Sequence, residues 1–187
     1  MYKQCNSEIT AKRQRHLENC LLELMQSNPY DKIPVGEICR LAGVPRGMFY
    51  RYFDSKQDAL HALIDHTLLE FLTDVVFVNQ PDAGDHLGME SVLNYWKTQQ
   101  PLLAALTQNR QEALLLERSI ICCIKDTHLL IPYLAKAGHS TEPEVIAFCI
   151  NGVLSTILIW HRSGYSKSTE EMAEILRKLL TTPIISR

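Results

Sequence analysis

The sequence lacks the short motifs that most catalytic sites require. Its 187 residues contain no G-x-S-x-G nucleophile elbow, no phosphate-binding loop of the form G-x-x-x-x-G-K-[ST] and no H-E-x-x-H signature. Each of these motifs places particular side chains or backbone N–H groups where a reaction needs them. We therefore predict that the protein is not an enzyme, has no catalytic residues and needs no cofactor.

Cysteine occurs six times, but never in the C-x-x-C spacing of zinc and redox sites. Most of these cysteines lie among apolar residues, where a free thiol packs as a small hydrophobe, so we expect reduced thiols and a cytoplasmic protein. Cys122, Cys123 and His128 come nearest to a metal-binding set. Because adjacent residues of a helix point in different directions, we predict no metal site. A metal-responsive protein is the alternative.

The sequence also has neither a secretory leader nor a long apolar run. The longest apolar stretch, Val145–Trp160, is interrupted by polar residues and is shorter than the roughly 20 residues of a membrane-spanning helix. Glycine and proline, with eight residues each, are too scarce for a disordered chain. We therefore expect a globular protein of one or two small domains that has no contact with a membrane.

Charge of one sign is not abundant either, since the formal net charge is −2. The basic residues are nevertheless unevenly placed. Residues 1–60 contain nine Lys and Arg against seven Asp and Glu, and residues 61–187 contain ten against fourteen. The excess of positive charge at the N-terminal end favours that end for contact with an anionic partner such as DNA.

Helical periodicity runs through most of the chain, and we find no convincing strand, so we predict an all-α fold. Proline, glycine and asparagine mark the interruptions, including turn-forming loops at 79–88 and 138–141. Pro132 is expected to disturb the stretch 127–137. The helices are expected at about 9–26, 34–42, 45–53, 55–78, 89–99, 101–108, 110–126, 143–162 and 168–180.

Two of these helices form a helix-turn-helix pattern between residues 34 and 53. Gly43 stands where the first helix must end, because glycine tolerates the left-handed backbone of a helix terminus. Val44 follows as an apolar contact, and Pro45 can begin the next helix without loss of a hydrogen bond. In such a motif the second helix lies in the major groove of DNA.

The second helix of the motif contains side chains suited to DNA recognition. Arg46 can donate to guanine, Gly47 allows close approach of the backbone, and Met48 can contact a thymine methyl group. Tyr50 and Tyr52 offer hydroxyl groups to phosphates, with a packed core aromatic as the alternative for Tyr52. The remaining predicted DNA-binding residues are Arg51, which has a solvated surface charge as its alternative, and Lys56, at the start of the next helix. Phe49 and Phe53 are expected in the core.

This region resembles the TetR/AcrR family of transcriptional regulators. The resemblance covers about residues 8–64 and is carried by Tyr30-Asp31-Lys32, Ile38, Ala42-Gly43-Val44, Arg46-Gly47 and the run Phe49-Tyr50-Arg51-Tyr52-Phe53-Asp54-Ser55-Lys56. It implies a three-helix DNA-binding domain, placed at 1–56, and a helical regulatory and dimerisation domain at 57–187. It also implies that the tyrosines and Lys56 contact the DNA backbone. Ile33-Pro34 departs from the family, which commonly has threonine at the start of this helix as a phosphate contact.

The helix expected at 143–162 is apolar nearly all round, so a second subunit is its simplest cover. The resemblance implies the same, since the last two helices of TetR-like subunits form a four-helix dimer interface. The C-terminal region also looks like that of Firmicutes-type members. The interface residues that we predict are Phe148, Gly152, Ile157, Trp160, Ile175 and Leu179.

The resemblance further implies an effector pocket inside the C-terminal domain. Position and residue type suggest as its lining Tyr95, Trp96, Leu103, Cys122, His128 and Phe148, although aromatic residues at helical spacing are more often plain core. We predict a homodimeric repressor that a small-molecule effector releases from a palindromic operator in double-stranded DNA. The alternatives are control by a protein partner or a metal, or action as an activator.

Overall fold

Helices alone make up the regular structure of the described part of the chain, which confirms the all-α prediction. The computed structural model describes residues 2–3, 7–77, 88–122, 125 and 141–181. Its elements are α1 (Glu8–Ser27), the 3-10 turn η1 (Tyr30–Lys32), α2 (Val35–Leu41), α3 (Arg46–Phe49), α4 (Lys56–Phe71), the π-helical turn η2 (Leu72–Phe77), α5 (Met89–Thr98), α6 (Gln100–Gln108), α8 (Pro143–Arg162) and α9 (Thr169–Thr181). Residues 112–122 are also helical. Most of the predicted loop at 79–88, the expected disturbance at Pro132 and most of the loop at 138–141 lie outside the described residues.

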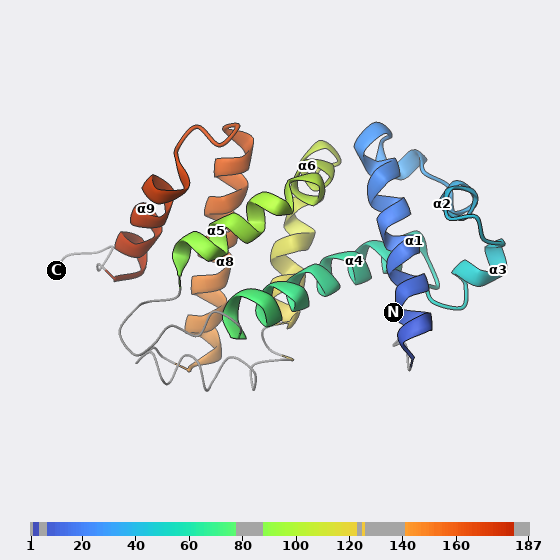
Figure 1. The fold of residues 1–187 in the computed structure, drawn as a ribbon, viewed down its shortest axis with the longest axis horizontal. Coiled ribbons are helices and arrows are strands. Elements are labelled where there is room, and N and C mark those ends of the chain that lie inside the picture. Colours follow the sequence, from blue (N-terminus) through green and yellow to red (C-terminus); the bar gives the residue numbers. More distant parts are fainter. Residues whose placement is uncertain (1, 4–6, 78–87, 123–124, 126–140, 182–187) are drawn as a thin grey trace.

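The first three helices pack around two phenylalanines. Phe49 and Phe53 are both fully buried, with ring centroids 5.1 Å apart, and Ile38 of α2 is buried with them. The expectation that both phenylalanines belong to the core is confirmed. Figure 1 shows α1, α2 and α3 gathered at one end of the long axis of the molecule.

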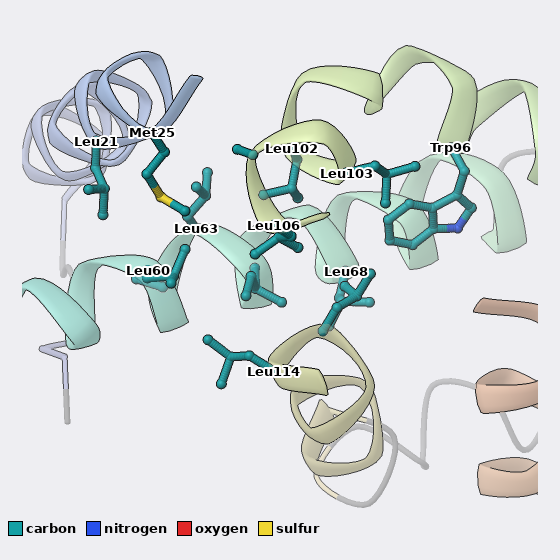
Figure 2. Close-up of a cluster of buried hydrophobic side chains, with 14 of the residues drawn as sticks. Leu21, Met25, Leu60, Leu63, Leu68, Trp96, Leu102, Leu103, Leu106 and Leu114 are labelled. Atoms are coloured by element: carbon teal, nitrogen blue, oxygen red, sulfur yellow. The ribbon is translucent and has the colours of Figure 1, made fainter. Parts of the chain in front are cut away.

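Helix α4 leads from this unit into the rest of the chain (Figure 1). Ser55 caps its N-terminus, because the Ser55 hydroxyl accepts the backbone N–H of Asp58 at 3.1 Å. Leu60 and Leu63 of α4 lie close to α1, while Leu68 lies farther along, toward α6 (Figure 2). One apolar core therefore extends from α1 along α4 to the C-terminal helices.

The C-terminal helices are arranged in two pairs around this core. Helix α8 packs against α6, and α9 packs against α5. At the start of α9 the Ser168 hydroxyl accepts the N–H of Glu171, and the Glu171 carboxylate accepts the N–H of Ser168, so the two residues form a capping box. Helices α8 and α9 lie at the end of the molecule away from α2 and α3 (Figure 1).

Two helix boundaries differ from the sequence-based expectation. The helix expected at 45–53 is much shorter, since α3 ends at Phe49. Beyond that residue the backbone tightens, with the N–H of Arg51 bound to the carbonyl of Met48 and the N–H of Tyr52 to that of Phe49. The helix expected at 110–126 begins at residue 112, because Arg110 has a positive φ of 55°.

Helix α8 is long and apolar enough to be compared with a membrane-spanning helix, but buried helices of globular proteins meet the same criteria of length and composition. Only 28% of the most apolar 18-residue stretch of this helix is buried within the chain. Ile157 and Trp160 face the interior, whereas Phe148 and Ile159 are 68% and 67% exposed. The helix therefore has one face in the core and one apolar face that the chain itself leaves uncovered.

The turn between α2 and α3 should depend on Gly43. Its φ of +65° lies in the left-handed region, and no atom lies within 4 Å of a Cβ built there. We expect Gly43→Ala to lower the free energy of unfolding by about 1–2 kcal/mol through backbone strain alone. Gly43→Asn should lose less, because asparagine tolerates this conformation. Urea unfolding of both variants checks this, and equal losses would contradict it.

Candidate nucleic-acid interface

The turn before α3 has the hydrogen bonds of a Schellman motif. The N–H of Val44 binds the carbonyl of Cys39 at 3.0 Å, and the N–H of Gly43 binds that of Arg40 at 3.2 Å. Pro45 then stands at the N-cap of α3. The local sequence thus ends α2 sharply and sets α3 across it, as the helix-turn-helix prediction required.

The predicted base- and phosphate-contacting side chains emerge on the outside of this unit. Arg46, Gly47, Tyr50 and Arg51 are exposed, and Met48 is half-buried. Within the described residues neither guanidinium group has a hydrogen bond or an ion pair. The Tyr50 side chain is 50% exposed, with its ring edge-on to buried Phe49. This surface therefore offers two free guanidinium groups and a phenol close together, which suits contact with an anionic groove.

Tyr52 differs from its neighbours because its side chain belongs to the core. It is only 5% exposed and packs against Phe53. Its carbonyl accepts the backbone N–H of Lys3 at 2.9 Å, and the Lys3 ammonium donates to the carbonyl of Tyr50. Lys3 thus lies beside Tyr50 and Tyr52, the residues that follow α3, a contact that the sequence did not indicate. The predicted phosphate contact of Tyr52 stays a prediction.

Lys56 has partners within the chain. Its ammonium donates to the carbonyls of Tyr30, Ile33 and Asp31 and lies 4.3 Å from the centre of the Tyr30 ring. Burial lowers the pKa of Lys56, and the nearby Asp31 partly opposes this. Lys56 therefore fastens η1 to the start of α4, which gives it a structural role beside the predicted phosphate contact.

This arrangement gives a physical reading of the Ile33-Pro34 departure. Pro34 occupies the N-cap of α2 and has neither a side-chain nor a backbone donor to offer. Ile33 is buried, and its carbonyl accepts from the Lys56 ammonium at 2.9 Å. The start of α2 is thus held from the side of α4.

Asn109 connects the C-terminal helices to the same turn. It lies at the end of α6, where its side-chain N–H donates to the carbonyl of Met25 at 3.1 Å and its side-chain oxygen accepts the N–H of Tyr30. Asparagine is common at helix ends, so its position could be read from the sequence. Its partners could not, because they belong to a distant part of the chain.

A buried charged cluster forms a second connection. Asp65 of α4 accepts from the Tyr2 hydroxyl at 2.8 Å and from Nε of Arg118 at 2.7 Å. Burial, and after it the Asp65 carboxylate, raises the pKa of Tyr2, while the hydrogen bond to Asp65 raises the pKa of Arg118. The cluster joins the N-terminus, α4 and the helical residues 112–122, and sequence reasoning missed it.

The structure brings together some of the predicted effector-pocket residues. Trp96 and Leu103 are buried, and the Tyr95 hydroxyl donates to the carbonyl of Thr67 at 2.7 Å. Figure 2 shows Trp96 beside Leu103. Cys122 is half-buried, with its sulfur 3.7 Å from an Asp65 oxygen.

Phe148 is not with this group, because its side chain points outward from α8 with 68% exposure. His128 lies outside the described residues. Among the described residues no group of three or more His, Cys, Asp or Glu side chains could hold a metal ion.

The residues predicted for a dimer interface fall into two sets. Phe148, Gly152 and Leu179 are exposed and Ile175 is half-buried. Ile157 and Trp160 are buried in the chain's own core, and the Trp160 indole N–H donates to the carbonyl of Lys167 at 3.0 Å. Only the first set is available to a second subunit without rearrangement.

Comparison with known proteins shows that the segment containing the helix-turn-helix is similar to a described family. Residues 21–63 match the family of bacterial regulatory proteins, tetR family. The HTH-type dhaKLM operon transcriptional activator DhaS of Lactococcus lactis subsp. lactis (strain IL1403) is 31% identical over 61 residues, which is 33% of each chain. The match thus spans about a third of that relative's length.

Two solved structures share the fold over nearly the whole chain. The fatty acid degradation regulator FadR from Bacillus halodurans superposes with a TM-score of 0.68 over 99% of this chain and 100% of its own, at 18% identity. A putative TetR-family transcriptional regulator from Syntrophomonas wolfei str. Goettingen gives a TM-score of 0.54 over 94% and 99%, at 18% identity. At this level of identity the likeness concerns the fold.

Lys56→Met should show whether the ammonium holds η1. Methionine keeps an apolar stem but leaves carbonyls in η1 without their donor, so we expect the free energy of unfolding to fall by about 1–3 kcal/mol. Lys12→Met is the control, because the Lys12 side chain is 76% exposed and pairs only with the exposed Glu8; it should change stability by less than about 0.5 kcal/mol. Equal stability of the two variants in urea would mean that the Lys56 ammonium is free for phosphate.

Proposed function

We propose that this chain, whose residues 21–63 match the tetR family, is a homodimeric transcriptional regulator that binds a palindromic operator. The observation that carries the proposal is the exposed end of the motif. There Arg46, Arg51 and Tyr50 lie close together without internal partners for the guanidinium groups. If these three side chains were only a solvated patch, they would not need to lie at the second helix of a helix-turn-helix, which is the helix that enters the major groove.

We assign base recognition to the first turn of α3 and backbone contacts to the residues after it. Arg46 stands at the start of α3, where a recognition helix meets base edges, and Gly47 and Met48 follow on the same turn. Tyr50 and Arg51 lie beyond the end of the helix and suit phosphate contacts. Tyr52 and Lys56 contribute mainly by holding this surface in place.

The dimer is proposed from the uncovered face of α8. Phe148 and Ile159 are each about two-thirds exposed, and Leu179 and Leu180 of α9 are 46% and 43% exposed. Large apolar side chains gathered on the last two helices indicate an interaction surface. A second copy of the chain would cover it with the same residues around a twofold axis, as palindromic DNA requires.

Effector control is proposed to act through α4. The boundary between a DNA-binding domain and a regulatory domain falls near residue 56, where α4 begins. The regulatory part is bonded to the N-terminal unit by Asn109 through Tyr30 and by Asp65 through Tyr2. A small molecule bound among the C-terminal helices would shift the population between two positions of α4 and thus the spacing of the recognition helices.

Repression is the output that we propose, with the effector releasing DNA in the cytoplasm. The Lactococcus lactis relative is named as a transcriptional activator, so activation is the alternative output. Selection from a random DNA duplex library, with wild type and a Tyr50→Ala/Arg51→Ala variant in parallel, tests the proposal. A palindrome enriched only by wild type would support it, and no enrichment by wild type at low salt would overturn it.

Arg51 and Tyr50 should be separable by the dependence of DNA affinity on salt. We expect Arg51→Ala to weaken binding and to reduce the slope of log K against log salt concentration by about 1, because one fewer phosphate is neutralised. Tyr50→Phe should weaken binding without a change of slope, since a neutral hydroxyl releases no counterion. Fluorescence anisotropy between about 50 and 200 mM salt measures both. An unchanged slope for Arg51→Ala would remove Arg51 from the phosphate contacts.

A single charged substitution on α8 tests the proposed dimer surface. Phe148→Asp should convert the dimer to monomer, because a carboxylate would be buried without a partner in the interface. The control is Leu69→Asp, which changes an exposed leucine (43%) on α4 and should leave the dimer intact. Sedimentation equilibrium measures the association of both. A Phe148→Asp variant that dimerises as tightly as wild type would exclude this face of α8.

A further inference from the structure

Gly36 occupies a position where its residue type needs an explanation. It is the second residue of α2, and in helix interiors glycine is less favourable than every residue except proline. Its backbone does not require glycine, because the only glycines with positive φ among the described residues are Gly43 and Gly164. A small side chain such as that of alanine would stabilise the helix unless the space beside Gly36 were already occupied.

That space is occupied by Arg46. A Cβ atom built on Gly36 would lie 2.3 Å from Nη2 of Arg46 and 3.0 Å from both its Cζ and its Nε. All three distances are shorter than van der Waals contact, so the guanidinium group lies directly against the backbone of α2. The absence of a side chain at residue 36 thus leaves the space in which the Arg46 guanidinium rests.

We propose that Gly36 is a positioning residue that orients Arg46 for base recognition, an inference that rests on the proposed function. Arginine reads guanine through two parallel hydrogen bonds, so its guanidinium plane must be well oriented. Within the described residues no hydrogen bond or ion pair orients Arg46, which leaves its packing against Gly36. A methyl group at residue 36 displaces the guanidinium, which must then be ordered when DNA binds.

The test is a double-mutant cycle on sequence selectivity. Wild type, Gly36→Ala, Arg46→Ala and the double variant are titrated with the operator recovered by library selection and with operators that each carry one substituted base pair. At the base pair that Arg46→Ala identifies, we expect Gly36→Ala to lower the ratio of affinities by on the order of fivefold. In the Arg46→Ala background the same substitution should change nothing. Urea unfolding should show Gly36→Ala to be at least as stable as wild type.

The proposal would be overturned if Gly36→Ala had the same ratio of affinities as wild type. It would also be overturned if Gly36→Ala lowered this ratio in the Arg46→Ala background, because Gly36 would then act independently of Arg46. The NMR signal of the Arg46 Nε–H in the protein without DNA provides a separate readout. It should move in Gly36→Ala, and an unmoved signal would overturn the proposal. If the signal moves but wild type selects no DNA sequence, the contact exists, and the proposed function fails together with the recognition role.

Discussion

The Lys56 ammonium, held by the carbonyls of η1, is the interaction on which the recognition surface depends. It joins the turn before α2 to the first residue of α4. The helix-turn-helix lies between these two points, so its position relative to α4 is fixed at both ends. Lys56 is half-buried and its ammonium has three carbonyl acceptors, so water screens these charge-assisted hydrogen bonds less than those of a fully solvated lysine. Lys56, which is of a residue type that often binds phosphate, thus also stabilises the fold through hydrogen bonds within the chain.

The turn η1 is also hydrogen-bonded to the C-terminal helices, so it contacts both halves of the chain. Asn109 binds the N–H of Tyr30, while Lys56 binds the Tyr30 carbonyl, so one residue connects α6 with α4. The apolar core runs in parallel with this polar connection, from Leu21 of α1 to Leu106 of α6 (Figure 2). A displacement of α6 therefore cannot leave the N-terminal unit unaffected, which is the physical requirement for effector control.

The other end of the molecule shows the opposite situation, because an apolar helix face has no cover within the chain. The interior side of α8 is closed by Ile157 and Trp160, and its outer side presents Phe148 and Ile159. Sequence periodicity could not distinguish the residues of the inner face of α8 from those of its outer face, since both faces are apolar. Only packing against α6 shows which residues belong to the subunit's own core and which remain for a partner.

Local chemistry determined much of this protein. Gly43 and Pro45 fixed the turn, Ser55 fixed the start of α4, and Phe49 and Phe53 could be assigned to the core from the sequence, because each depends on neighbours a few residues away. The exposed Arg46, Tyr50 and Arg51 were predictable for the same reason. Only the tertiary structure decided the partners of Lys56, Asn109 and Asp65, the burial of Tyr52 and the contact of Gly36 with Arg46. These depend on residues brought together from distant parts of the chain, and no local pattern specifies which carbonyl or carboxylate a side chain will meet.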